Sequence, residues 1–305
     1  MRRTASPCLV LLLLALVSIP RVAAAQSAPA LRVDARSRSV APGELVILTV
    51  AGDAAAIDNV RVTAFSKELR AYRSADGTWQ ALVGIDLDQR PGRYTANVEA
   101  DAGGATIRES HTFIVERRTF PTRTLRVNPD FVNPPPEELT RIAEDQKFIR
   151  LVYASSAATR QWSEPFTRPV PGTANSAFGS RSVFNGQPRS PHAGADFLSP
   201  CGTPIITPNA GRVLCARSLY FTGNTVIIDH GLGVFSMLAH LSRLDVHEGD
   251  AVKEGQIVGL VGATGRVTGP HLHWALSVSG ARVDPLSMLA VLGDTKARAA
   301  ATPPR

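Results

Sequence analysis

Residues 269–278 read Gly-Pro-His-Leu-His-Trp-Ala-Leu-Ser-Val, and this stretch decides the fold of the second half of the chain. Pro270 can open a strand but cannot lie at its centre. Side chains of an extended chain alternate between two faces. One face is therefore apolar and consists of Leu272, Trp274, Leu276 and Val278. The other face carries His271 and His273, so we predict a strand that packs on a core and presents both imidazoles to an open surface or cleft.

Two further segments carry residues of the same chemistry. In His192-Ala-Gly-Ala-Asp196 the imidazole and the carboxylate are four positions apart, on one face of an extended segment. Both groups are natural zinc ligands. A third histidine, His240, lies inside the apolar segment 238–241. Alone, each pattern has an ordinary interpretation: an exposed pair on a strand, a local hydrogen bond, and a core histidine.

In combination, these residues predict a catalytic zinc site. His192, Asp196 and His273 supply three protein ligands. Three ligands leave the fourth position of tetrahedral zinc for water, as in catalytic rather than structural sites. His240 and His271 then remain as free imidazoles for proton transfer.

The surrounding sequence resembles a known family over residues 172–286. It is similar to the catalytic domain of the lysostaphin and LytM type zinc endopeptidases. Their His-x-Gly-x-Asp motif matches the segment from His192 to Asp196, and their His-x-His motif matches His271 to His273. Three further stretches are similar, namely 176–181, 223–231 and 262–273. One departure is Leu238, where the family often has a tyrosine; this change affects no zinc ligand.

The resemblance implies roles for five residues. It implies one Zn²⁺ per chain, bound by His192, Asp196 and His273. It implies that His240 and His271 assist the chemistry, without deciding which of them is the general base. Zinc polarises a scissile carbonyl and lowers the pKa of bound water.

Residues 26–118 predict an immunoglobulin-like β-sandwich. Short segments rich in β-branched and aromatic residues alternate with Gly and Pro turns, as is typical of this fold. The predicted strands are Leu45 to Val50, Val60 to Phe65, Trp79 to Ile85, Tyr94 to Val98 and Thr112 to Val115. The region is similar to the immunoglobulin-like amino-terminal domain found on some bacterial members of the same family.

Residues 119–170 predict a connector with one amphipathic helix. Pro134-Pro-Pro136 ends the preceding strand, and apolar residues then recur at helical spacing over 137–153. Residues 171–293 predict an antiparallel β catalytic domain of the LytM type. The fold class is therefore mainly β, with a single connector helix between two β-rich domains.

The two ends of the chain are expected to lie outside the folded domains. Arg2 and Arg3, an apolar run over 8–20 and an Ala-rich ending before residue 26 predict a signal peptide over 1–25. We therefore expect export to the periplasm or cell envelope, without a permanent membrane span. The Ala- and Pro-rich tail, residues 294–305, predicts disorder.

Charge excludes one class of partner. The formal net charge of the whole chain is +7, and the predicted signal peptide contributes Arg2, Arg3 and Arg21 to it. The remaining surplus is mildly basic, which suits either simple solubility or an anionic partner such as the cell wall. Lys and Arg are scattered without interleaved aromatic residues, so nucleic-acid binding is not expected.

The cysteines predict a disulfide. Cys8 belongs to the signal peptide, which leaves Cys201 and Cys215 in a protein bound for an oxidising compartment. They flank two short predicted strands around a turn at 208–211, and a hairpin would bring its ends together. The alternative is a pair of free buried thiols.

The resemblance implies a zinc endopeptidase that hydrolyses peptide bonds in the stem or cross-link peptides of bacterial peptidoglycan. One alternative is a non-catalytic cell-wall-binding activator of a separate amidase, but such relatives typically lose zinc ligands. A second is a structural zinc module, which would need a fourth protein ligand. We interpret His230 as a turn residue and His247 as a surface residue.

Overall fold

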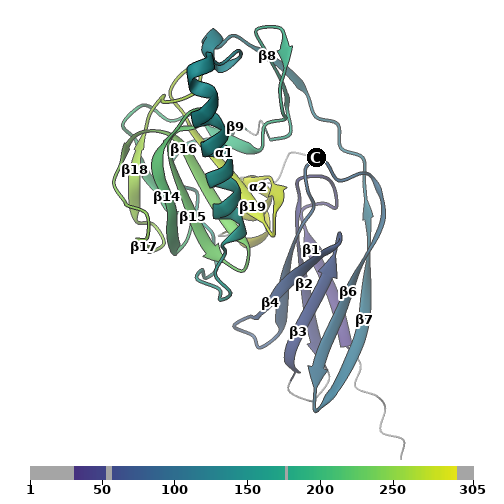
Figure 1. Cartoon of the computed structure of the whole chain (residues 1–305). Helices are drawn as coiled ribbons and strands as arrows, with labels where there is room; N and C mark the ends of the chain where they lie inside the picture. Colours follow the sequence, from purple (N-terminus) through teal and green to yellow (C-terminus); the bar gives the residue numbers. More distant parts are fainter. Residues whose placement is uncertain (1–30, 53–56, 176–177, 294–305) are drawn as a thin grey trace, which may run out of the picture.

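The computed structural model describes residues 31–52, 57–175 and 178–293 (Figure 1). The predicted signal peptide and the predicted disordered tail lie outside these residues. Strands dominate the described chain, so the predicted mainly β class is confirmed. No helix in the described ranges combines the length and the apolar character needed to cross a membrane.

The front domain is a seven-stranded β structure that encloses its own core. Its strands are β1 (Leu31–Ser37), β2 (Leu45–Gly52), β3 (Ile57–Ala64), β4 (Lys67–Arg73), β5 (Trp79–Gly84), β6 (Gly92–Ala102) and β7 (Ala105–Val115). They pair in the order β1-β2-β5-β4-β3-β6-β7. This order corresponds to the two layers of an immunoglobulin domain, β1-β2-β5-β4 and β3-β6-β7, joined here along β3 and β4. The Tyr94 hydroxyl donates to the Arg90 carbonyl at 2.9 Å, as in a tyrosine corner, and the predicted sandwich is confirmed.

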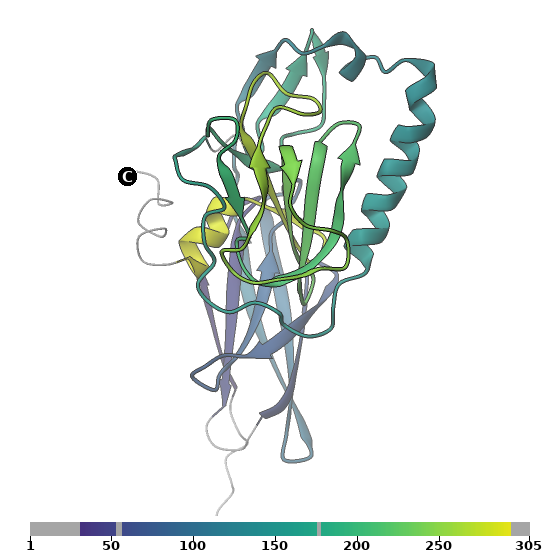
Figure 2. The same ribbon diagram turned by 90° about the vertical axis from the view of Figure 1, so that its left-hand side faces the viewer.

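The connector forms a short strand and two 3₁₀ helices before its α-helix. It contains β8 (Thr122–Leu125), the short 3₁₀ helices Pro129–Phe131 and Pro136–Glu138, and α1 (Leu139–Ala154). Strand β8 pairs in parallel with β10 (Arg181–Phe184), which in turn pairs with β11 (Gln187–Pro188). Helix α1 agrees with the predicted helix over 137–153 and lies along the outside of the second domain (Figures 1 and 2).

The second domain is built on a ten-stranded sheet in which every pairing is antiparallel. Its strands are β9 (Ala174–Asn175), β12 (Gly194–Phe197), β13 (Pro204–Ile206), β14 (Gly211–Leu219), β15 (Gly223–Gly231), β16 (Val234–Leu244), β17 (Ala251–Val252), β18 (Ile257–Val261), β19 (Leu272–Val278) and β20 (Ala281–Val283). The main path is β17-β14-β15-β16-β19-β12-β9. The last helix, α2 (Pro285–Leu292), packs against β12 and β19 and against the front domain.

The predicted strand at 269–278 is present as β19, with the expected two faces. Leu272, Trp274, Leu276 and Val278 are buried in the core, and the alternate residues are only partly buried. Across the sheet, Trp274 lies opposite Ala195 of β12 and Leu238 of β16. Burial of Leu238 in this core means that the family's tyrosine position points away from the cleft here.

One hydrophobic core extends across both domains and is separate from the core inside the sandwich. Leu45 and Ile47 of β2 pack with the second domain, whereas their neighbours Val46 and Leu48 pack inside the sandwich. A strand buried on both faces reads as an unbroken apolar run, which explains the sequence Leu45-Val-Ile-Leu48. The front domain is therefore joined to the second domain through side chains that are fully buried.

A buried charge network crosses the same interface. The Arg38 guanidinium contacts Glu44 at 2.6 Å and Asp284 at 2.9 Å. Arg118 adds a contact to Glu44 at 2.8 Å, and the Ser287 hydroxyl donates to Glu44 at 2.7 Å. Burial raises the pKa of the Asp284 carboxyl, and the charge of Arg38 opposes that shift. These contacts fix α2 and the front domain in one arrangement.

The predicted disulfide between Cys201 and Cys215 is wrong, because both cysteines are free. Strand β13 follows Cys201 and strand β14 contains Cys215, but the two strands do not form a hairpin. Instead, β13 pairs with β18, and β14 pairs with β15 and β17. Cys215 is fully buried under α1, whereas Cys201 is exposed in a turn. Close spacing in sequence therefore did not bring the two thiols together.

Candidate metal centre and active site

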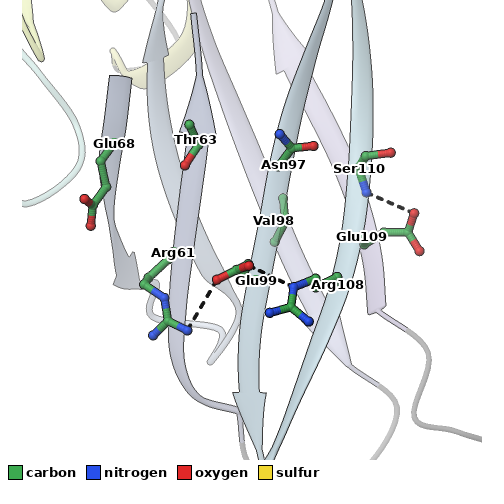
Figure 3. Close-up of a pocket in the computed structure, with 9 residues that line it drawn as sticks. All are labelled: Arg61, Thr63, Glu68, Asn97, Val98, Glu99, Arg108, Glu109 and Ser110. Atoms are coloured by element: carbon green, nitrogen blue, oxygen red, sulfur yellow. Dashed lines mark hydrogen bonds and ion pairs between the residues drawn. The ribbon is translucent and has the colours of Figure 1, made fainter. Parts of the chain in front are cut away.

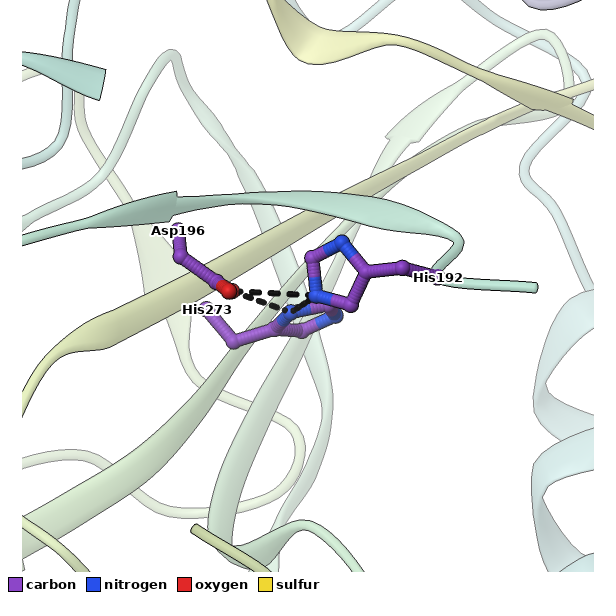
Figure 4. Close-up of side chains that lie close together, drawn as sticks. All are labelled: His192, Asp196 and His273. Atoms are coloured by element: carbon purple, nitrogen blue, oxygen red, sulfur yellow. Dashed lines mark hydrogen bonds and ion pairs between the residues drawn. The ribbon is translucent and has the colours of Figure 1, made fainter. Parts of the chain in front are cut away.

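Two strands and one loop bring the predicted metal ligands together. Asp196 on β12 lies directly opposite His273 on β19, so their side chains share a face of the sheet. His192 lies in the loop that leads into β12. The three side chains point toward one another (Figure 4).

The ligating atoms form a near-equilateral triangle. Nε2 of His192 lies 3.0 Å from Nδ1 of His273 and 3.0 Å from Oδ1 of Asp196, and the third side is also 3.0 Å. Tetrahedral zinc with ligand bonds of about 2.0–2.2 Å separates its ligand atoms by about 3.3 Å. Two imidazoles and one carboxylate at this spacing fit such an ion. Among the described residues, these three form the group of side chains able to hold a metal.

Gly194 allows this approach. A Cβ atom at this position would lie 2.5 Å from the Trp274 carbonyl oxygen and 2.6 Å from Cε1 of His273. Both distances are shorter than real Cβ contacts. Any other residue would therefore push β12 away from β19 and separate Asp196 from His273.

The protonation states of the cluster suit a metal ion. Burial alone would raise the pKa of Asp196, but contacts with His192 and His273 hold that pKa well below its ordinary value. Burial lowers the pKa of His273. An ionised carboxylate and a neutral imidazole are the forms that bind metal.

His240 reaches the cleft through a break in the strand pattern. Strict alternation along β16 would place it on the core face with Leu238. Its φ of 70° and the nearby register shift turn it instead toward the metal cluster, with its ring 5.9 Å from that of His273. Bulges next to active sites often re-aim a side chain in this way. The His240 Nδ1–H donates to the Thr264 carbonyl at 2.8 Å, and burial lowers the pKa of His240 to about 3.

His271 completes the group of imidazoles. Its ring lies 5.0 Å from that of His240, and its Nε2 lies 3.7 Å from Oδ1 of Asp196. Its Nδ1–H donates to the Gly269 carbonyl at 2.9 Å. Because carbonyl oxygens only accept, both His240 and His271 keep Nε2 free for proton transfer.

Two other histidines have different surroundings. His247 is exposed, as expected. His230 is fully buried on β15 rather than at a turn, where its ring nitrogens contact the Ala210 carbonyl at 2.8 Å and the Ser236 hydroxyl at 2.9 Å. Trp274 donates to the same hydroxyl at 3.1 Å, so His230 supports the strand that carries His273.

The five site residues line one cavity of about 550 Å³. Residues of β8 and β10 form a wall that the sequence did not predict, including Arg123, Leu125 and Phe184. Tyr153 of α1 and Arg266 of the loop before β19 also line it. Predicting this wall would have required knowing that β8 pairs with β10. No local sequence pattern encodes that pairing.

A second hollow, of about 660 Å³, lies on the front domain (Figure 3). Arg61, Glu99 and Arg108 meet there in ion pairs of 2.9 and 3.5 Å. Its lining residues include no histidine or cysteine. The first cavity is therefore the candidate active site.

Comparison with known proteins agrees with this geometry. Residues 190–285 match the model of peptidase family M23. The chain is 46% identical over 95 residues to the peptidoglycan DD-endopeptidase ShyA of Vibrio cholerae, covering 31% of this chain and 22% of that protein. It is 40% identical over 97 residues to the DD-carboxypeptidase/endopeptidase Mpg of Neisseria meningitidis, covering 32% of this chain and 22% of that protein. The chain thus spans about a fifth of the length of these curated relatives.

A solved structure extends the match to both domains. The crystal structure of a putative peptidase M23 from Pseudomonas aeruginosa is similar with a TM-score of 0.65 and 31% identity, covering 82% of this chain and 95% of that one. The family match at 190–285 includes both histidine motifs, from His192 to His273. This chain therefore belongs to peptidase family M23.

Proposed function

We propose that this protein is a zinc-dependent endopeptidase that hydrolyses peptide bonds in the stem or cross-link peptides of bacterial peptidoglycan. One observation carries the proposal: three ligand atoms lie 3.0 Å from one another, with two more imidazoles in the same cavity. The choice of substrate is supported by the similarity to ShyA, a peptidoglycan DD-endopeptidase, and to Mpg, a DD-carboxypeptidase/endopeptidase.

In this proposal His192, Asp196 and His273 hold one Zn²⁺ per chain. When bound, zinc would act as a Lewis acid toward a scissile carbonyl and lower the pKa of water. The three ligands are only partly exposed, between 13 and 21%. Partial burial strengthens the electrostatic interactions of the site relative to bulk water.

His240 and His271 act as the proton-transfer groups. Each has its Nδ1–H held by a backbone carbonyl, so that each can accept a proton on Nε2. One imidazole can take a proton from the attacking water while the other donates to the developing oxyanion or the leaving amine. Both rings line the cavity, with their centres 5.0 Å apart.

The same proposal includes export and domain organisation. A signal peptide over 1–25 would direct the chain to the periplasm or cell envelope, where peptidoglycan lies. The domains would span 26–118, 119–170 and 171–293. The alternative of a non-catalytic activator predicts loss of a ligand, and the ligand set here is intact. A structural zinc module predicts a fourth protein ligand, whereas neither Cys201 nor Cys215 joins the cluster.

The test is digestion of purified peptidoglycan by the zinc-loaded mature protein, with products identified by mass spectrometry. We expect new amino termini at peptide bonds and no cleavage of glycan. His247→Ala, which changes an exposed histidine outside the cavity, serves as the matched control. Intact peptidoglycan after prolonged incubation with the metal-loaded protein would contradict the proposed function.

A further inference from the structure

The cavity contains an arginine held between two aromatic rings. The guanidinium carbon of Arg266 lies 4.8 Å from the ring centre of Phe184 and 4.8 Å from that of Phe221. Phe184 belongs to β10 and Phe221 to the loop before β15, so the rings come from opposite walls. Cations over aromatic faces at this distance are attracted to both rings. The side chain is therefore fixed in place rather than free to move in solvent.

Arg266 has no anionic partner among the described residues. Its guanidinium makes no ion pair there and no hydrogen bond to a side chain or carbonyl. Burial lowers its pKa, and the charge of Arg189 lowers it further. Arg189 itself contacts only neutral oxygens, the carbonyl of Val132 and the side chain of Gln187. Neither guanidinium is paired with a carboxylate within the part of the chain that the structure describes, although burying a charge without a partner is unfavourable.

The backbone fixes Arg266 beside the proton-transfer group His240. The Arg266 amide donates to the Phe221 carbonyl at 2.8 Å, and the His240 amide donates to the next carbonyl, that of Thr222, at 2.9 Å. Gly223 and Gly265 pack backbone against backbone, with φ of 60° and 76°. A Cβ on Gly265 would lie 2.4 Å from the Gly223 amide nitrogen, so only glycine permits this contact.

We propose that Arg266, supported by the positive charge of Arg189, binds a free carboxylate of the peptide substrate next to the scissile bond. The inference rests on the proposed function, which makes the substrate a peptide. The anionic group that a peptide offers to an arginine is a carboxylate. A guanidinium presents its N–H groups in a plane that matches a carboxylate, and such a contact in a half-buried cavity is both strong and directional. Arg266 is thus a substrate-specificity residue and not a proton-transfer residue.

The experiment uses a synthetic cross-linked peptide and a series in which one carboxylate at a time is replaced by a carboxamide. kcat/KM is measured for the zinc-loaded mature protein and for Arg266→Met. We expect one amidation to lower kcat/KM of the wild type by about 10- to 100-fold, the range of a hydrogen bond to a charged group. The same amidation should change kcat/KM of Arg266→Met by less than about threefold. The position of the sensitive carboxylate, terminal or side-chain, identifies which group is bound.

Two variants separate charge from packing. Methionine keeps apolar contact with Phe184 and Phe221, so the loop remains supported. Arg266→Lys keeps the charge without the planar fork and should retain part of the preference. Arg243→Met removes an equal charge from the exposed pair with Asp245, outside the cavity, and should keep the full preference.

Equal cleavage of every peptide by the wild type would overturn the inference, as would an undiminished preference in Arg266→Met. If the wild type cleaves none of the peptides, the proposed function fails and binding decides the inference. Isothermal titration must then show tighter binding of the free-acid peptide to the wild type than to Arg266→Met. Equal binding to both proteins would overturn the carboxylate site as well.

Discussion

The molecule contains two clusters of buried ionisable side chains, and they differ in how their charges are balanced. At the domain interface, Arg38 and Arg118 face Glu44 and Asp284, and each carboxylate has a cationic partner within 3 Å. In the cleft, Asp196 faces only imidazoles. The first cluster is complete as protein alone and holds two domains together. In the second, a carboxylate and imidazole nitrogens converge with no Arg or Lys paired to that carboxylate among the described residues, as suits a site for a metal ion.

The largest expected effect follows from removing one metal ligand. His273→Ala leaves two protein ligands, so we expect loss of bound zinc and a fall in peptidoglycan hydrolysis of at least about 10³-fold, because the groups act as a unit. Metal analysis of the purified variant beside a zymogram measures both. His247→Ala, at an exposed position, should change neither. Normal hydrolysis with stoichiometric zinc in His273→Ala would overturn the ligand assignment.

A smaller loss of activity is expected when the metal is kept but a proton-transfer group is removed. We expect His271→Ala to bind zinc as the wild type does and to lose about 10²- to 10⁴-fold in kcat, the range for general acid–base catalysis. His240→Ala should behave similarly, provided that its fold is retained by circular dichroism. If His271→Ala loses zinc in parallel with activity, His271 belongs to the ligand set instead.

The interface cluster should show the opposite behaviour, with a loss of stability and no loss of metal. Arg38→Met leaves Glu44 and Asp284 buried with only Arg118 as a counter-charge. Removing one partner of a buried pair costs about 3–5 kcal/mol, which urea unfolding would measure. Arg32→Met, at an exposed ion pair, should change the free energy of unfolding by no more than about 1 kcal/mol. A zinc content that falls with Arg38→Met would show that the two clusters are coupled.

Local patterns in the sequence were sufficient for most of the elements, and the site residues that they nominated line one cavity. Alternation predicted both faces of β19. Asp196 lies on β12 opposite His273, whereas His192 lies in the loop before that strand. The turn signals and short strands predicted the front sandwich, and helical spacing predicted α1. Each of these features depends on neighbours within a few residues, which is the range that periodicity reports.

Features that depend on distant pairing were missed. The disulfide failed because β13 pairs with β18 rather than with β14. The resemblance, and not strand alternation, predicted His240 for the site: it faces the cleft because of a positive φ and a register shift, and alternation alone would bury it in the core. His230 was predicted to be a turn residue, although β15 extends through it. The cleft wall around Phe184 requires β8 to cross from the connector, which no local signal predicts.

Acidification tests the buried histidine His230, which lies outside both clusters. His230 has no carboxylate within hydrogen-bonding contact, and burial lowers its pKa from 6.5 to about 4. Between these values the unfolded chain binds more protons than the folded one, so stability is complete above about pH 6.5 and is lost as the pH falls toward 4. We expect the single group to account for about 3 kcal/mol across this window.

The matched variants isolate that contribution. His230→Gln should flatten the fall in unfolding free energy between pH 6.5 and 4 relative to the wild type, whatever its own stability at neutral pH. His247→Gln removes an exposed imidazole and should leave the slope unchanged. An unchanged slope in His230→Gln would mean that this histidine is already protonated in the folded protein.

The smallest effect is expected at the exposed end of the interface. Arg282 contacts Asp86 at 2.6 Å and Asp88 at 2.7 Å, but the Asp88 side chain is 68% exposed. Asp88→Asn should therefore lower the free energy of unfolding by less than about 1 kcal/mol, since water and salt screen exposed pairs. Urea unfolding at low and high salt measures this change directly. A loss as large as that of Arg38→Met would mean that contact geometry, rather than burial, determines how strongly charged pairs hold the two domains together.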